Sequence, residues 1–105
     1  MKLLAVTTTV AHREDAQRIA RALVERRLAA CAQISVIESF YVWQGALEHE
    51  GEFRLLLKTT EAAYPALESA LRELHPYELP AIYAVAVEHA GAEYTAWVES
   101  GSRGT

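Results

Sequence analysis

The sequence has one cysteine, few basic residues and no long apolar run, and each of these shortages excludes a class of protein. Cys31 is the only cysteine among 105 residues. It cannot form a disulfide within the chain or a paired-cysteine metal motif, and its isolation favours a reducing compartment, so we expect a cytoplasmic protein. No apolar run approaches the roughly 20 residues that cross a bilayer. Ten Lys and Arg against 14 Asp and Glu give a formal net charge of −4. We therefore expect neither nucleic acid nor a membrane as partner.

Apolar residues make up 51% of the chain, which is enough for the core of one small domain. Hydrophobic periodicity and turn residues predict the elements in order. Strands are expected over 3–9, 30–43, 47–60 and 81–87, and helices over 13–27, 64–74 and 92–100. This β-α-β-β-α-β order with an added helix is the split βαβ, or ferredoxin-like, α+β pattern. We expect one domain over residues 1–100 and a flexible tail over 101–105, which has no apolar anchor.

The two middle strands are long for so small a domain. Fourteen residues extend roughly 45 Å, whereas a 100-residue domain is roughly 35 Å across. Gln44-Gly45 supplies the turn between them, and Gly51 predicts a bulge. We expect a projecting hairpin whose apolar tip, and the apolar edge strand over 81–87, are covered by further copies of the chain. A sharp bend at Gly51 with cover from the third helix is the alternative.

Several short motifs together indicate a family. They are Arg27-Leu28-Ala29-Ala30-Cys31, Ser39-x-Tyr41-x-Trp43-x-Gly45-x-Leu47, Glu52, Leu57-Lys58-Thr59, His75-Pro76-Tyr77-Glu78-x-Pro80 and Tyr94-x-x-Trp97. In this set and order the chain resembles the CutA family of divalent-cation-tolerance proteins. The resemblance implies a ferredoxin-like subunit, a homotrimer joined through its long hairpins, and a link to copper and other divalent cations. It also implies a similarity of architecture to the PII signalling proteins, which bind small ligands at subunit clefts.

The sequence departs from the family where a metal site has been proposed. Thr8 stands where some bacterial relatives have a cysteine, and Leu74 stands where they have a second histidine. We therefore expect copper or another divalent cation to bind weakly at most, and no cofactor to be required. The stretch between Cys31 and Tyr41 is one residue shorter than in most relatives and lacks their Ile-Pro kink, which predicts a straighter strand.

Two residues are candidates for metal binding. His75 precedes Pro76, so its backbone is extended at the end of a helix, where the imidazole could bind a cation or simply cap the helix. The thiolate of Cys31 would suit Cu(I), but a lone cysteine at the start of a strand is more often a small buried hydrophobe. We favour the buried reading for Cys31 and leave both readings of His75 open.

Five residues are candidates for binding a small ligand. Lys58 could hold an anion in a cleft between subunits, or it could lie on a solvated strand face in an ion pair. Tyr41, Trp43, Tyr77 and Tyr94 could line a pocket for a planar ligand or anchor an interface, and we assign Trp43 to the interface.

The sequence favours a trimeric protein of divalent-cation tolerance that binds a cation or small ligand in an intersubunit cleft. The first alternative is a PII-like regulatory module for an anionic metabolite or a partner protein. No nucleophile–base pair or phosphate loop is present, so an enzyme is not the expected reading. It would require Glu78 or Glu52 to orient the His75 ring.

Overall fold

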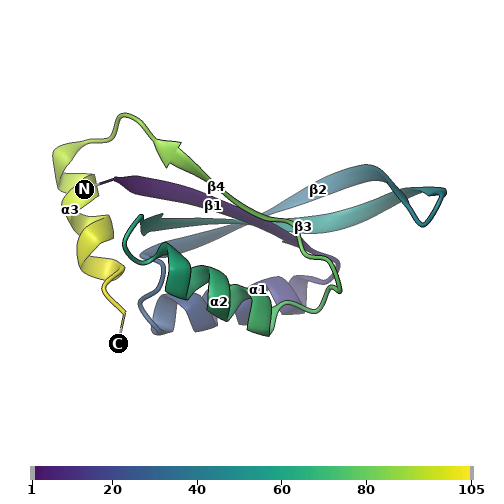
Figure 1. Ribbon diagram of the computed structural model, residues 1–105, viewed down its shortest axis with the longest axis horizontal. Coiled ribbons are helices and arrows are strands. Elements are labelled where there is room, and N and C mark those ends of the chain that lie inside the picture. The colour runs from purple at the N-terminus through teal and green to yellow at the C-terminus, as the bar shows by residue number, and fades with distance from the viewer. Residues whose placement is uncertain (1, 105) are drawn as a thin grey trace.

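The computed structural model describes residues 2–104 and contains the predicted elements in the predicted order (Figure 1). The strands are β1 (Leu3–Val10), β2 (Cys31–Trp43), β3 (Ala46–Thr60) and β4 (Ile82–Val87). The helices are α1 (Arg13–Glu25), α2 (Tyr64–Leu74) and α3 (Ala92–Gly101). The fold is α+β, with one four-stranded antiparallel sheet in the order β2-β3-β1-β4.

Helices α1 and α2 cover one face of the sheet, and the core lies between them and the strands (Figure 1). The apolar residues of that face alternate along the central strands, as a half-buried strand requires. Fully buried members of the core are Val6, Val10, Ala16, Ile19, Leu23, Ala29, Leu55, Leu57, Leu67 and Leu71. Helix α2 contributes an apolar stripe in which Leu67 and Leu71 are fully buried, while Tyr64 and Leu74 are partly buried at its margins.

Helix α1 ends two residues earlier than the periodicity predicts. Arg27 has a φ of 58°, in the left-handed region, and this ends the helix. The N–H of Leu28 donates to the carbonyl of Leu23, and the N–H of Arg27 donates to that of Val24. These two bonds form a Schellman motif, in which arginine takes the position that glycine usually occupies. Arg26 and Arg27 therefore lie beyond the end of α1, whereas the predicted helix over 13–27 places them in its last turn.

The β2–β3 hairpin is continuous from end to end. Its register runs from the pair Cys31–Lys58 to the pair Trp43–Ala46 without interruption, and Glu38 lies directly opposite Gly51. The predicted bulge at Gly51 is therefore wrong. The turn is confirmed, since Gln44 and Gly45 have φ values of 51° and 83°, as a two-residue hairpin loop of the primed type requires.

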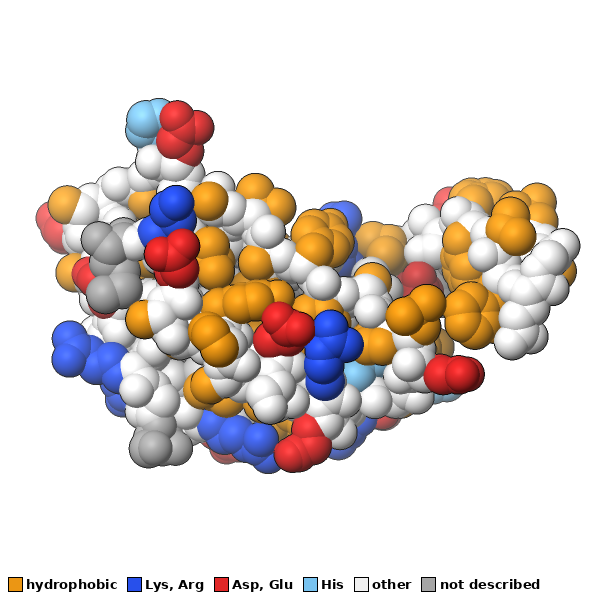
Figure 2. All heavy atoms as spheres, in the orientation of Figure 1, with side chains coloured by type: hydrophobic (Ala, Val, Ile, Leu, Met, Phe, Trp, Pro, Cys, Tyr) orange, Lys and Arg blue, Asp and Glu red, His pale blue; other side chains and the backbone are white. Residues whose placement is uncertain are grey.

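The hairpin projects well beyond the helices, as Figure 1 shows. The molecule measures 45 × 27 × 21 Å along its principal axes, and the hairpin lies along the longest. Apolar side chains gather on the projecting end (Figure 2). The exposed apolar side chains of the hairpin are Val36, Phe40, Tyr41, Val42, Trp43 and Leu47. Edge strand β4 likewise exposes Tyr83 and Val85.

The last residues pack against the domain rather than leaving it. Gly101 belongs to α3, Ser102 is buried, and the N–H of Gly104 donates to the carbonyl of Arg27 at 2.8 Å. Residues 101–104 thus make helix and backbone contacts with the domain, and the flexibility of the tail stays a prediction. Residue 105 lies outside the described residues.

Candidate functional site

A cleft of about 720 Å³ lies between the hairpin and the loop that joins α2 to β4. The hairpin supplies one wall because β2 and β3 continue past the end of β1, and the loop containing Pro76 and Pro80 supplies the other. The lining residues are Thr9, Glu38, Ser39, Phe40, Tyr41, Trp43, Glu52, Tyr77, Glu78, Leu79 and Ala81. This volume lies within the range of small-molecule sites.

Tyr77 and Glu52 join the two walls of the cleft. The Tyr77 hydroxyl donates to Glu52 Oε2 at 2.6 Å, which connects the loop to β3 across 25 residues of sequence. Glu52 is only 7% exposed, an unusual burial for a carboxylate. Burial, followed by the hydrogen bond to Glu52, raises the pKa of Tyr77 well above its ordinary value. Tyr77 is therefore a neutral donor at physiological pH, and it stabilises the buried carboxylate.

Tyr41 and Trp43 lie on the hairpin wall of the same cleft. The Tyr41 hydroxyl donates to Glu50 on the facing strand, and this bond raises the pKa of Tyr41 to about 12. Trp43 is 40% exposed and occupies the last position of β2 before the turn. Three of the five predicted ligand-binding residues, Tyr41, Trp43 and Tyr77, are thus brought together in one cleft.

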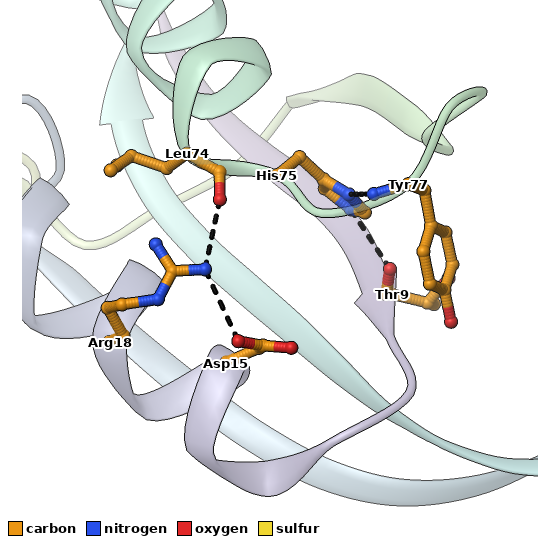
Figure 3. Close-up of polar contacts among 6 residues, drawn as sticks. All are labelled: Thr9, Asp15, Arg18, Leu74, His75 and Tyr77. Atoms are coloured by element: carbon orange, nitrogen blue, oxygen red, sulfur yellow. Dashed lines mark hydrogen bonds and ion pairs between the residues drawn. The ribbon is translucent and has the colours of Figure 1, made fainter.

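His75 is buried behind the loop with both ring nitrogens engaged (Figure 3). Nδ1 accepts the backbone N–H of Tyr77 at 3.1 Å, and so it carries no proton. Nε2 lies 3.0 Å from the carbonyl oxygen of Thr9 and 2.9 Å from the hydroxyl of Thr8, and its proton suits the carbonyl. Burial is the main cause that lowers the pKa of His75 below 6.5. The ring is therefore neutral and holds the loop against β1.

The two predicted metal ligands lie apart. His75 contacts Thr8, which pairs with Leu55 on the helix-covered face, whereas Cys31 pairs with Lys58 on the opposite face and belongs to edge strand β2, which β3 separates from β1. Within residues 2–104, no three His, Cys, Asp or Glu side chains are grouped closely enough to hold one metal ion. His75 stands at the C-terminal end of α2, where its backbone N–H donates to the carbonyl of Leu71, while its ring contacts β1 and the following loop rather than the helix carbonyls.

The remaining predicted ligand residues lie outside the cleft. Lys58 Nζ donates to Gln33 Oε1 at 3.1 Å on the sheet face opposite the helices. Tyr94 stacks on Trp97 of α3 with 5.9 Å between ring centroids. It also lies beside the half-buried Cys31 thiol, and burial followed by this neighbour raises the pKa of Tyr94. These side chains share a second region and do not meet Tyr41 or Tyr77.

The neutral, buried state of His75 predicts that the protein loses stability in acid. The unfolded chain takes up a proton at its ordinary pKa of 6.5, above the lowered pKa of the folded state. Stability from this residue is thus complete above about pH 6.5 and declines as the pH falls below that value. Urea unfolding at pH 7.5 and 5.5 should show a smaller pH effect in His75→Gln than in wild type.

His89→Gln is the control for this experiment, because the His89 side chain is 92% exposed. It should keep the pH dependence of wild type at the same protein concentration. Equal pH dependence in wild type and His75→Gln would show that the His75 ring is not held neutral by the fold.

Sequence reasoning missed part of the cleft wall. Glu38, Phe40 and Leu79 all line it, yet each looks like an ordinary strand or loop residue. The available signal was the hairpin register, since residues before the Gln44-Gly45 turn face residues after it at predictable positions. The acid–base reading of His75 is not supported, because its ring partners are Thr8, Thr9 and Tyr77 and include no carboxylate.

Comparisons with known proteins agree on one family. A family model described as CutA1 divalent ion tolerance protein matches residues 4–101. The divalent-cation tolerance protein CutA of Thermus thermophilus is 44% identical over 94 residues, which cover 89% of this chain and 91% of that protein. None of the helices within residues 2–104 has the length and apolar character needed to cross a membrane.

Two solved structures share the fold. The divalent cation tolerance protein Cut A1 from Thermus thermophilus gives a TM-score of 0.90 at 40% identity, covering 95% of this chain and 98% of that one. The periplasmic divalent cation tolerance protein CutA from Archaeoglobus fulgidus gives 0.93 at 31% identity, covering 96% and 99%. The motifs, the sheet and the family match together show that the chain belongs to the CutA1 divalent ion tolerance family.

Proposed function

We propose that the chain acts as a homotrimer of ferredoxin-like subunits that binds a cation or small ligand in the cleft at a subunit boundary. The observation that carries the proposal is the hairpin, which extends beyond the domain and bears exposed apolar side chains such as Phe40, at 65%, and Val42, at 69%. An exposed apolar hairpin and an apolar edge strand are aggregation hazards unless they are paired. A closed three-fold ring covers both and leaves no free edge for further growth.

Light scattering coupled to size exclusion tests this assembly. One monodisperse species of about three times the 11.6 kDa subunit mass is expected at micromolar concentration. Reversible melting should also rise with protein concentration, because partners stabilise the folded state by mass action. A stable monomer under these conditions would contradict the proposal.

A weak divalent-cation site at His75 belongs to the same proposal. A copper ion could reach Nδ1 only by displacing the Tyr77 N–H, and Cys31 cannot assist because it lies on edge strand β2, on the opposite face of the sheet. Binding should therefore be weak, and weaker still in acid as the imidazole takes up a proton. Equal calorimetric heats for CuCl₂ in wild type and His75→Gln would remove His75 from the set of ligands.

An anionic metabolite, as in the PII-like alternative, fits the cleft poorly. Its described lining contains three carboxylates and no lysine or arginine, and Lys58 points to Gln33 on another part of the sheet.

A cytoplasmic location remains part of the proposal on the strength of the single cysteine, although the Archaeoglobus fulgidus protein is called periplasmic. Cell fractionation decides between the two compartments.

A further inference from the structure

The cleft combines negative charge with aromatic surface. Glu52 and Glu78 line it, and no basic side chain is among the described residues that do so. Tyr41, Trp43 and Tyr77 supply aromatic rings, whereas Glu38 and Phe40 point to the other face of the hairpin, where both contact His49. The face of an aromatic ring carries negative potential and attracts cations, most of all tryptophan. Both features therefore favour a positively charged occupant.

Glu52 adds a largely buried carboxylate that can accept a further hydrogen bond. It is 7% exposed, and its Oε2 accepts the Tyr77 hydroxyl. Its second oxygen, Oε1, has no hydrogen-bond partner among residues 2–104, although a carboxylate oxygen can accept two bonds. Among the described residues the only buried side-chain atom without a partner is Ser102 Oγ, so Glu52 Oε1 is open to the cleft. A cation in the cleft would pair with this oxygen.

The spacing of the carboxylates selects the kind of cation. No three acidic or other metal-binding side chains within residues 2–104 are close enough to share one metal ion. The cleft volume of about 720 Å³ is that of a site for an organic molecule. A metal ion would stay hydrated among such walls, whereas an alkylated ammonium sheds water easily and packs against aromatic rings.

We propose that this cleft binds a small organic cation whose ammonium group lies against Trp43, Tyr41 and Tyr77 and is neutralised by Glu52. This inference rests on the proposed function, since it names the ligand class of the same cleft. Tyr77 contributes in two ways. Its ring lines the wall of the cleft, and its hydroxyl holds the Glu52 carboxylate in place. Glu78 adds a second negative charge that draws the cation toward the opening.

A pair of isosteric probes separates charge from shape. Choline and 3,3-dimethyl-1-butanol have the same outline, but only choline carries a positive charge. Calorimetric titration of the wild-type protein should show saturable binding of choline at least ten-fold tighter than that of the alcohol. Choline affinity should fall as NaCl is raised, because the lining charge is then screened. Equal affinity for both probes, or saturable binding of neither, would overturn the proposal.

Two variants place the binding in this cleft. Glu52→Gln removes the charge with little change of shape and should weaken choline binding about ten-fold. Glu88→Gln, at a carboxylate just after β4 that is 88% exposed, changes the net charge equally and should leave binding as in wild type. Tyr77→Phe provides a second test through the orientation of Glu52 and should weaken binding several-fold. Wild-type affinity in both Glu52→Gln and Tyr77→Phe would show that the cation binds elsewhere.

Light scattering on the titrated samples measures the oligomeric state, so the ligand class and the trimer are tested separately. A trimer that binds choline no better than the alcohol contradicts the ligand class alone. A monomer that binds choline through Glu52 supports the ligand class and contradicts the trimer. Circular dichroism of each variant, matching that of wild type, confirms that a loss of affinity does not arise from unfolding.

Discussion

Replacing Trp43 with alanine is expected to dissociate the assembly and to lower the melting temperature at the same time. Trp43 is 40% exposed in the subunit, and it stands at the end of the hairpin that we propose to lie between subunits. A tryptophan has roughly 250 Å² of surface, so about 100 Å² is exposed, and assembly buries the part that does not face the cleft. At about 25 cal/mol per Å², that burial contributes at most about 2.5 kcal/mol per contact before association costs.

Light scattering at a series of concentrations measures this effect, and Trp43→Phe is the matched control. Phenylalanine keeps an aromatic ring at the contact, so it should retain the trimer over most of the concentration range. Trp43→Ala should shift the dissociation midpoint to higher protein concentration by ten-fold or more. If Trp43→Ala assembles and melts like wild type, the hairpin end is not the contact between subunits.

Replacing Leu71 with alanine is expected to destabilise the subunit strongly. Leu71 is fully buried on α2 and belongs to the core cluster between the helices and the sheet. Truncating such a leucine removes its transfer free energy and leaves a cavity, which together cost about 2–5 kcal/mol. The protein should remain folded at 25 °C but unfold at a clearly lower guanidinium concentration.

Leu71→Met is the control, because it nearly conserves the volume and should cost less than about 1.5 kcal/mol. Guanidinium titrations at one fixed protein concentration give both values, since any coupling to assembly then affects the variants alike. A cost below about 1 kcal/mol for Leu71→Ala would mean that the contact between α2 and the sheet is not a close-packed core.

The sequence predicts the elements well because their signals are local. The apolar stripe of α2, the alternation along β3 and the Gln44-Gly45 turn each depend on neighbours in the chain, and all three are confirmed. The wrong predictions concern backbone conformation. Gly51 pairs with Glu38 in a regular ladder, and Arg27 adopts a left-handed conformation that arginine seldom takes. Neither is visible in hydrophobic periodicity, because periodicity reports which side chains are buried and not the backbone dihedral angles or hydrogen bonds.

The sequence by itself determined the order of elements, the excessive length of the hairpin and the family, since periodicity, composition and motif spacing are properties of the chain alone. Tertiary structure alone decided which candidate residues meet. Tyr77 reaches Glu52, and His75 lies against Thr8 and Thr9, while Cys31 lies on the opposite face of the sheet. The physical reason is that these contacts join segments 25 to 67 residues apart, and strand register and the path of the loop determine them.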